Sequence, residues 1–259
     1  MLVAGVDASA EPLSADRPGQ ANPPTIVEPG VLQLEGGVTL QGNGGAEPVD
    51  VPGRTDDGGQ LDVPELEMRL GVHPRVELQL QFDGFSYRWS DGESDASGAT
   101  DLGIDARVYL WDQSRWRPES AVQLGLSIPT GADALTSDGF DPSLNLLYQW
   151  GLTRRVSLNG NFVFGAPSRG TDTSGRYFEF EPSLALGISL AERVGTFVEY
   201  YGSIRTEGLD DNHGFDGGFT WLATENLQLD VNGGLGLSGS KPGFFAGLGA
   251  AWRLPPLWT

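Results

Sequence analysis

The chain has 259 residues, among them 38 glycines and 17 prolines, and carries a formal net charge of −19. This charge argues against nucleic acid as a partner, because a phosphate backbone repels an acidic protein. So many glycines and prolines argue against a helical protein, and no segment reaches the roughly 18 consecutive apolar residues of a membrane-spanning helix. The length suits one large all-β domain.

The first 30 residues precede any repeating pattern. Ala8-Ser9-Ala10 has the A-x-A form of a signal cleavage site, although residues 2–6 are too short for a hydrophobic signal core. We therefore expect Met1 to lie inside a longer signal, with the mature chain beginning near Glu11; a chance match in an alanine-rich stretch is the alternative. Residues 11–30 are rich in proline, which predicts an extended leader without strands.

From residue 31 to residue 254, apolar and polar residues alternate in twelve segments. Successive side chains of a strand point to opposite faces, so one parity can meet lipid while the other meets a wet lumen. Segments of about ten residues suit a tilted membrane strand, whereas soluble strands usually have about five to six. The predicted strands are 31–40, 62–72, 76–87, 100–111, 118–128, 140–152, 156–164, 177–190, 194–204, 215–223, 227–235 and 244–254.

The connections between these segments alternate between short turns and long loops. With an even number of strands, both ends of the chain fall on the side of the short turns, which bacterial barrels place in the periplasm. The sequence therefore predicts an all-β fold: a closed antiparallel transmembrane β-barrel of about 12 strands over residues 31–254. Residues 1–30 would be a signal remnant and a periplasmic leader or plug, and residues 255–259 a tail.

The two parities of the predicted strands differ sharply in charge. None of the residues on the apolar parity is charged, and an Arg or Lys facing lipid at mid-membrane would cost about 2–4 kcal/mol. The opposite parity is acidic, and pairs such as Glu67 and Arg69 are expected to stiffen the wall. The predicted lumen-lining residues are Glu35, Glu65, Glu67, Arg69, Glu77, Asp83, Asp101, Asp105, Arg107, Glu179, Glu181, Glu199 and Asp230. A soluble β-sandwich or lipocalin-like barrel, with the Leu and Phe face inside, is the alternative.

Two segments near the start carry a family resemblance. Asp16-Arg17-Pro18, followed by Gly30-Val31-Leu32-Gln33-Leu34-Glu35-Gly36-Gly37, resembles the opening of the MetA-pathway phenol-degradation family of bacterial outer-membrane barrels, also described as a transporter family. Its members begin with a DRP motif and then a G-x-x-Q-x-E-G strand, and the segments 126–131, 199–202 and 226–230 are similar in the same order. The resemblance implies an outer-membrane barrel that moves small hydrophobic or aromatic compounds. The tail beyond the last strand departs from the terminal aromatic residue that serves such barrels as an assembly signal.

The sequence offers little for catalysis. Its two histidines are His73, in a predicted tight turn, and His213, near Ser203 but without an evident orienting group for a Ser–His pair. The alternating acids Asp91, Glu93 and Asp95 do not complete an EF-hand pattern. We therefore predict no enzymatic activity, no cofactor and no metal site.

The expected function is passive passage of small molecules through an acidic lumen, which would favour cations and neutral solutes over anions. The expected partners are outer-membrane lipid, a small-molecule solute and, during biogenesis, the barrel-assembly machinery. A structural or adhesive surface protein that transports nothing is the alternative.

Overall fold

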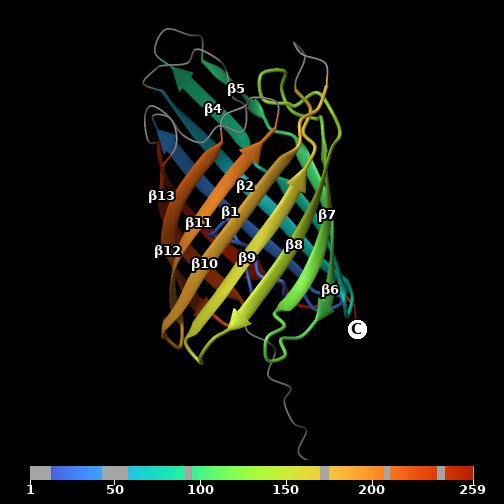
Figure 1. Ribbon diagram of the computed structural model, residues 1–259, viewed down its shortest axis with the longest axis vertical. Coiled ribbons are helices and arrows are strands. Elements are labelled where there is room, and N and C mark those ends of the chain that lie inside the picture. Colours follow the sequence, from blue (N-terminus) through green and yellow to red (C-terminus); the bar gives the residue numbers. More distant parts are fainter. Residues whose placement is uncertain are drawn as a thin grey trace, which may run out of the picture.

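The computed structural model describes residues 13–42, 58–90, 95–169, 175–206, 211–237 and 243–258. Each strand pairs antiparallel with its neighbours, and β1 pairs with both β2 and β14, which closes the sheet into a barrel (Figure 1). No helix in these ranges is long and apolar enough to cross a membrane. The strands are β1 (Leu32–Gly42), β2 (Gly58–His73), β3 (Val76–Phe82), β4 (Phe85–Ser90), β5 (Ala96–Ala99), β6 (Leu102–Trp111), β7 (Glu119–Ile128), β8 (Asp141–Gly151), β9 (Val156–Gly165), β10 (Glu179–Ala191), β11 (Val194–Arg205), β12 (Asn212–Thr224), β13 (Leu227–Gly236) and β14 (Phe244–Arg253).

Two of the barrel strands are interrupted. Only Asp83 and Gly84 separate β3 from β4, and both of these strands pair with β2. The second interrupted strand is β5 and β6, which pair with β4 and β3 respectively. The first break lies opposite Pro64, which has no backbone N–H to donate to a ladder. When each interrupted strand is counted once, the described residues form a closed antiparallel barrel of twelve strands. The predicted fold class and strand number are confirmed.

Several predicted strand ends were wrong. The loop expected at 88–99 is shorter, because β4 continues to Ser90 and β5 pairs with it through Ala96 and Ala99. In the same way β2 begins at Gly58 and β12 at Asn212. The added residues of β5 and at the starts of β2 and β12 are mostly small or polar, so the apolar alternation stops there before the backbone pairing does. In β4 the alternation itself continues, with Tyr87 and Trp89 against Arg88. Backbone hydrogen bonds continue a hairpin without needing an apolar face.

The distribution of burial is the reverse of that in a soluble protein. The side chains of Arg69 and Arg107 are 0% exposed, whereas Leu124 is 61% and Val198 is 59% exposed. Apolar side chains cover the outside and polar ones fill the inside, which is stable only when lipid surrounds the barrel. This rules out the soluble alternative. Barrels of this kind occur in bacterial outer membranes, so the chain spans that membrane.

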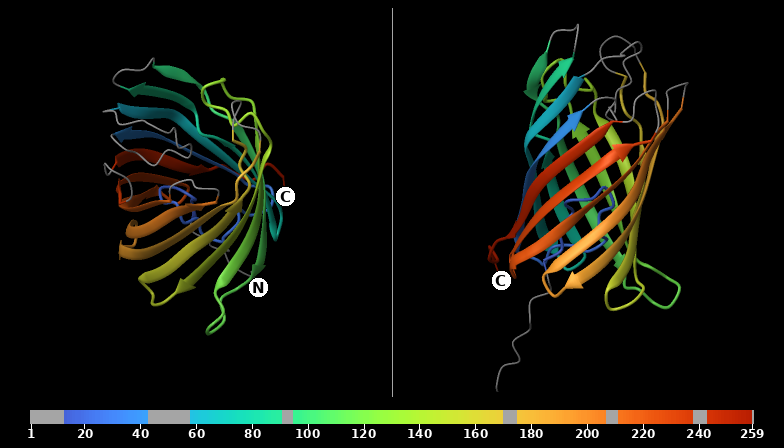
Figure 2. Two further views of the ribbon diagram at one scale, coloured as in Figure 1. Left: turned by 45° about the horizontal axis from the view of Figure 1, so that its top comes forward. Right: turned by 90° about the vertical axis from the view of Figure 1, so that its left-hand side faces the viewer.

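The two ends of the barrel differ. The short turns β2–β3, β6–β7, β8–β9, β10–β11 and β12–β13 lie at the end where the chain terminates, and the longer connections lie at the other (Figures 1 and 2). Residues 13–31, here called the leader segment, enter at the short-turn end, where the Leu257 amide donates a 2.7 Å hydrogen bond to the Gly30 carbonyl. The rule for bacterial barrels makes this end periplasmic.

Candidate functional site

The leader segment lies inside the barrel (Figure 2). It contains little regular structure, and its residues Leu13, Asp16, Ala21 and Val27 are buried. Its side chains and backbone contact residues of β1, β2, β3, β6, β9, β11, β13 and β14. The inner wall therefore holds the leader segment from most of its circumference.

Asp16 is the charged centre of this arrangement. Its carboxylate lies 3.0 Å from Nη1 of Arg69 on β2 and accepts hydrogen bonds from Nη1 and Nη2 of Arg107 on β6, at 3.0 and 2.5 Å. Burial alone raises the pKa of the Asp16 carboxyl, but the charges of Arg107 and then Arg69 outweigh it and hold this pKa below its ordinary value. The carboxylate thus stays ionised where it joins two strands.

The same two arginines are satisfied on their other sides by the wall. Arg69 donates from Nε to Glu77 at 2.9 Å and from Nη1 to Glu35 at 3.1 Å, while Arg107 donates from Nε to Gln123 at 2.8 Å. Buried guanidinium groups persist only when paired and fully hydrogen bonded. The predicted pair of Glu67 with Arg69 does not form: Arg69 instead bonds Asp16, Glu35 and Glu77.

Wall carboxylates also bind the leader backbone. Glu35 accepts from the amides of Asp16 and Arg17 at 3.0 Å each, and Glu77 accepts from the amide of Val27 at 2.6 Å. An extended proline-rich segment has no regular ladder of internal backbone hydrogen bonds. Its buried amides must therefore find acceptors elsewhere, and part of the acidic wall supplies them.

The far side of the barrel binds the middle of the leader segment in the same way. Glu199 on β11 accepts from the amides of Gln20 and Ala21, at 2.7 and 2.5 Å. Asn161 on β9 accepts from the Asn22 amide at 2.6 Å and donates to the Asn22 carbonyl at 3.1 Å. The leader segment thus crosses the lumen between opposite walls.

Arg17 occupies a slot built from two glycines. Its Nη1 lies 2.8 Å from Glu65 and its Nη2 lies 3.5 Å from Asp230. Gly37 of β1 and Gly249 of β14 pair across the strands, and a Cβ on either would lie 2.4 or 2.2 Å from the guanidinium. Only glycine leaves room for such an approach.

These contacts explain the two segments that carried the family resemblance. The amides of Asp16 and Arg17, in D-R-P, bond Glu35 of the Q-x-E-G-G strand, and Arg17 lies against Gly37 of that strand. Gln33 donates to both Glu35 and the Ser14 carbonyl, at 2.8 and 2.9 Å. The two segments, 12 residues apart in the sequence, form one site.

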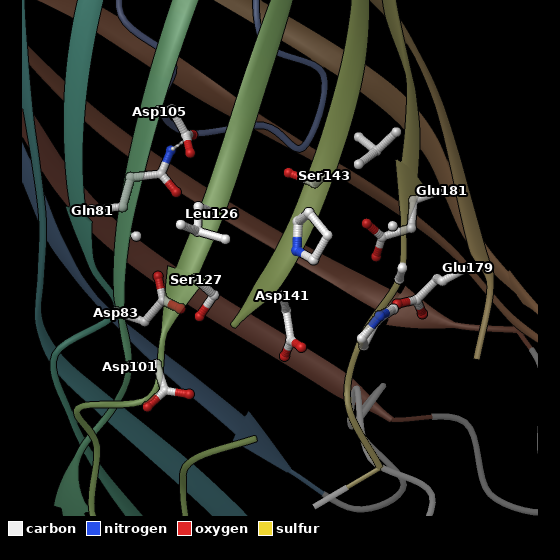
Figure 3. A pocket seen from close by; sticks show the side chains of 16 residues that line it. Gln81, Asp83, Asp101, Asp105, Leu126, Ser127, Asp141, Ser143, Glu179 and Glu181 are labelled. Atoms are coloured by element: carbon white, nitrogen blue, oxygen red, sulfur yellow. Dashed lines mark hydrogen bonds between the residues drawn. The ribbon is translucent and has the colours of Figure 1, made fainter. Parts of the chain in front are cut away.

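A cavity of about 250 Å³ lies toward the long-loop end. Figure 3 shows carboxylates from several strands directed into it, together with the apolar side chain of Leu126. Glu179 is paired with Arg205 and Asp141 with Arg176, but within the described residues no hydrogen bond or ion pair reaches Asp83 or Glu181. The acidic side chains lining the cavity are Asp83, Asp101, Asp105, Asp141, Glu179 and Glu181.

The predicted lumen residues fall into two groups. Those that contact the leader segment or its bound arginines are Glu35, Glu65, Arg69, Glu77, Arg107, Glu199 and Asp230. Those lining the cavity are Asp83, Asp101, Asp105, Glu179 and Glu181, while Glu67 is half-buried in the wall between them.

Sequence reasoning missed the residues that organise the centre. Asp16, Arg17 and Gln33 were named only as parts of the family motifs, and the neutral partners Gln123 and Asn161 were not singled out as site residues. The signal in the sequence that could have identified Asp16 and Arg17 was the charged DRP motif, because the rest of the leader is poor in charge. Arg205, expected at the start of a loop, ends β11 and pairs with Glu179 at 2.8 Å.

The candidate Ser–His pair does not form. Ser203 donates to Glu179, whereas Nδ1 of His213 lies 2.7 Å from the Tyr200 hydroxyl. Nδ1 of His73 accepts from the Arg75 amide at 3.2 Å, as a turn residue would. Asp91 and Glu93 of the acidic loop, and the predicted cleavage site near Ala10, lie outside the described residues.

One protein family matches most of the chain. Residues 15–254 match the family described as "Putative MetA-pathway of phenol degradation". The chain belongs to this family. The match includes most of the leader segment and all twelve barrel strands. No curated protein matches the sequence.

Solved structures show the same fold. The chain is similar to the COG4313 outer membrane channel from Pseudomonas putida F1, with a TM-score of 0.67 at 15% identity over 92% of this chain and 99% of that one. It is also similar to the NanC porin, with a TM-score of 0.53 at 8% identity over 86% of this chain and 100% of that one. The translocator domain of the autotransporter NalP from Neisseria meningitidis gives a TM-score of 0.52 at 10% identity over 92% and 90% of the two chains.

Proposed function

We propose that this family member is an outer-membrane channel for passive passage of small molecules, and that its leader segment partly plugs the lumen. The observation that carries this proposal is the leader segment itself. It crosses the barrel from the Arg69–Arg107 side to Glu199 and Asn161, bound by polar groups at both walls. In an eight-stranded barrel the side chains of the wall are enough to fill the interior. Twelve strands enclose a wider lumen.

The cavity supports a preference among solutes. Asp83 and Glu181 face it without partners among the described residues, so the entrance favours cations and neutral molecules over anions. Leu126, Val163, Pro142 and Pro167 line the same space. A mixed acidic and apolar lining suits small hydrophobic or aromatic compounds, in agreement with the family description. The similar protein from Pseudomonas putida F1 is described as an outer membrane channel.

Single-channel conductance in planar bilayers tests the proposal. We expect cation-selective steps for the full chain, larger steps when residues 11–30 are deleted, and a smaller cation preference when Glu67 and Glu181 are both changed to Gln. Heat-dependent mobility on gels would show that each variant is folded. A folded barrel that conducts neither with nor without the leader would contradict the proposal and favour the structural or adhesive role.

A further inference from the structure

The short-turn end of the barrel is basic, although the chain as a whole is strongly acidic. The long connections between strands contain thirteen acidic and four basic residues, whereas the five short turns contain three acidic residues, Asp112, Glu192 and Glu225. The six arginines of the short turns are Arg75, Arg115, Arg117, Arg154, Arg155 and Arg193. Net positive charge is therefore concentrated at the periplasmic rim.

The β6–β7 turn combines this charge with exposed aromatic rings. The Arg115 guanidinium lies 5.9 Å from the centre of the Trp116 ring, and that of Arg117 lies 5.5 Å from the centre of the Trp111 ring. Trp116 is 81% exposed. Stacking fixes each guanidinium by its face and leaves N–H groups at its edge to donate. Within the described part of the chain, neither arginine forms an ion pair with a carboxylate.

Hydrogen bonds join this turn to its neighbours. Gln113 accepts from the Gly151 amide at 2.7 Å, and Trp150 donates from Nε1 to the Trp116 carbonyl at 3.3 Å. These two hydrogen bonds join the β6–β7 turn to the β8–β9 turn. On the other side Arg75 donates from Nη1 to the Leu110 carbonyl at 3.4 Å. Three consecutive short turns thus form a continuous surface, here called the arginine arc, made of Arg75, Arg115, Arg117, Arg154 and Arg155.

The position of the arginine arc determines which kind of partner can bind it. Trp111 and Trp150 stand at the ends of β6 and β8, where aromatic residues mark the boundary between lipid tails and headgroups. Leu152, in the β8–β9 turn, is also exposed. A soluble acidic protein would complement the charge but not the neighbouring apolar rings. A phospholipid offers both a phosphate for the guanidinium groups and acyl chains for the outer face of the barrel.

We propose that the β6–β7 and β8–β9 turns bind the phosphate of an anionic phospholipid in the periplasmic leaflet. Arg115 and Arg117, held by Trp116 and Trp111, donate to the phosphate oxygens, and Arg154 and Arg155 lie beside them on the adjoining turn. The site is separate from the lumen and does not depend on what the barrel conducts.

Native mass spectrometry of the full chain tests this site. Protein in mixed micelles would be offered equal amounts of phosphatidylglycerol and phosphatidylcholine, and the lipid retained after release from the micelle would be counted. We expect the intact protein to retain phosphatidylglycerol preferentially, and R115Q/R117Q to weaken that retention about tenfold. The matched control is R169Q/R176Q, which removes the same charge at the opposite end and should retain lipid like the intact protein.

Two results would overturn the proposal. One is equal retention of both lipids by the intact protein. The other is the same loss in R169Q/R176Q as in R115Q/R117Q, which would assign the effect to net charge or to the other leaflet. If R115Q/R117Q does not fold, Trp116→Ala replaces it, since this exposed ring holds Arg115 in place: unchanged preference for phosphatidylglycerol in that variant would also count against the site.

Discussion

At the scale of single residues, Asp16 determines how the leader segment is held. Its carboxylate lies between two guanidinium groups that have no exposure to solvent, and those groups contact Glu35, Glu77 and Gln123 behind it. Removing one partner of a buried ion pair leaves an uncompensated charge, which is far more costly than never having built the pair.

We therefore expect Asp16→Asn to release the leader segment, because Arg69 and Arg107 would each lose a charged partner at a cost of about 3–5 kcal/mol. The measurement is channel conductance together with cleavage of the leader by an added protease, and both should increase. Asp133→Asn, a loop residue with the same change of charge, is the control. Conductance and cleavage equal to those of the control would contradict the central role of Asp16.

The glycine slot around Arg17 leads to a second prediction. The methyl group added by Gly37→Ala or by Gly249→Ala would overlap the Arg17 guanidinium. Each substitution should therefore displace Arg17 from Glu65 and make the leader more accessible to protease. At Gly151 the nearest heavy atom to an added Cβ is 3.6 Å away, so Gly151→Ala is the matched control. Unchanged protection of the leader in both slot variants would show that Arg17 can bind elsewhere.

At the scale of elements, the twelve strands were predictable because a strand in a membrane has a period of two and a fixed minimum length. The alternation identified all of them from charge and hydropathy, and it placed Glu35, Glu77 and Glu199 on the inward parity. It could not show that the hairpin extends through β5, whose residues Ala96–Ala99 are all small and carry no apolar alternation. Nor could it show that Asp16 binds Arg107, since that contact joins residues 91 apart and depends on how the leader folds inside the closed barrel.

The break between β3 and β4 gives a prediction for stability. Gly84 has a φ of +94°, and a Cβ there would lie 2.4 Å from the Pro64 carbonyl oxygen. Gly84→Ala should therefore lower the free energy of unfolding by about 1–3 kcal/mol, measured by urea titration of the barrel in lipid vesicles. Gly165→Ala, whose Cβ would meet nothing closer than 3.6 Å, is the comparison and should change it much less.

At the scale of the whole molecule, charge is sorted along the barrel axis. The long loops and the cavity are acidic and the periplasmic rim is basic, while at the centre three arginines pair with part of the carboxylates. Solutes arriving from outside therefore meet negative potential first. Long-range attraction of this kind is screened by salt, with a Debye length near 10 Å at about 0.1 M.

The cation preference that we propose for the channel should therefore fall as ionic strength rises. Asp83→Asn with Glu181→Gln should reduce it at low salt and have little effect at high salt, as read from reversal potentials under a salt gradient. Asp112→Asn with Glu225→Gln makes the same change of charge at the short turns and serves as control. An equal loss of preference in that control would place the selectivity elsewhere than the cavity.

The glycine slot also bears on the order of assembly. Gly37 belongs to the first strand and Gly249 to the last, so the slot comes into being only when the two ends of the sheet have met. In an open sheet Arg17 has half a binding site, and the contacts that depend on it cannot be completed. The contacts of Arg17 are consequently completed only when the seam closes, and a nascent barrel still lacking its final strand would hold its leader without them.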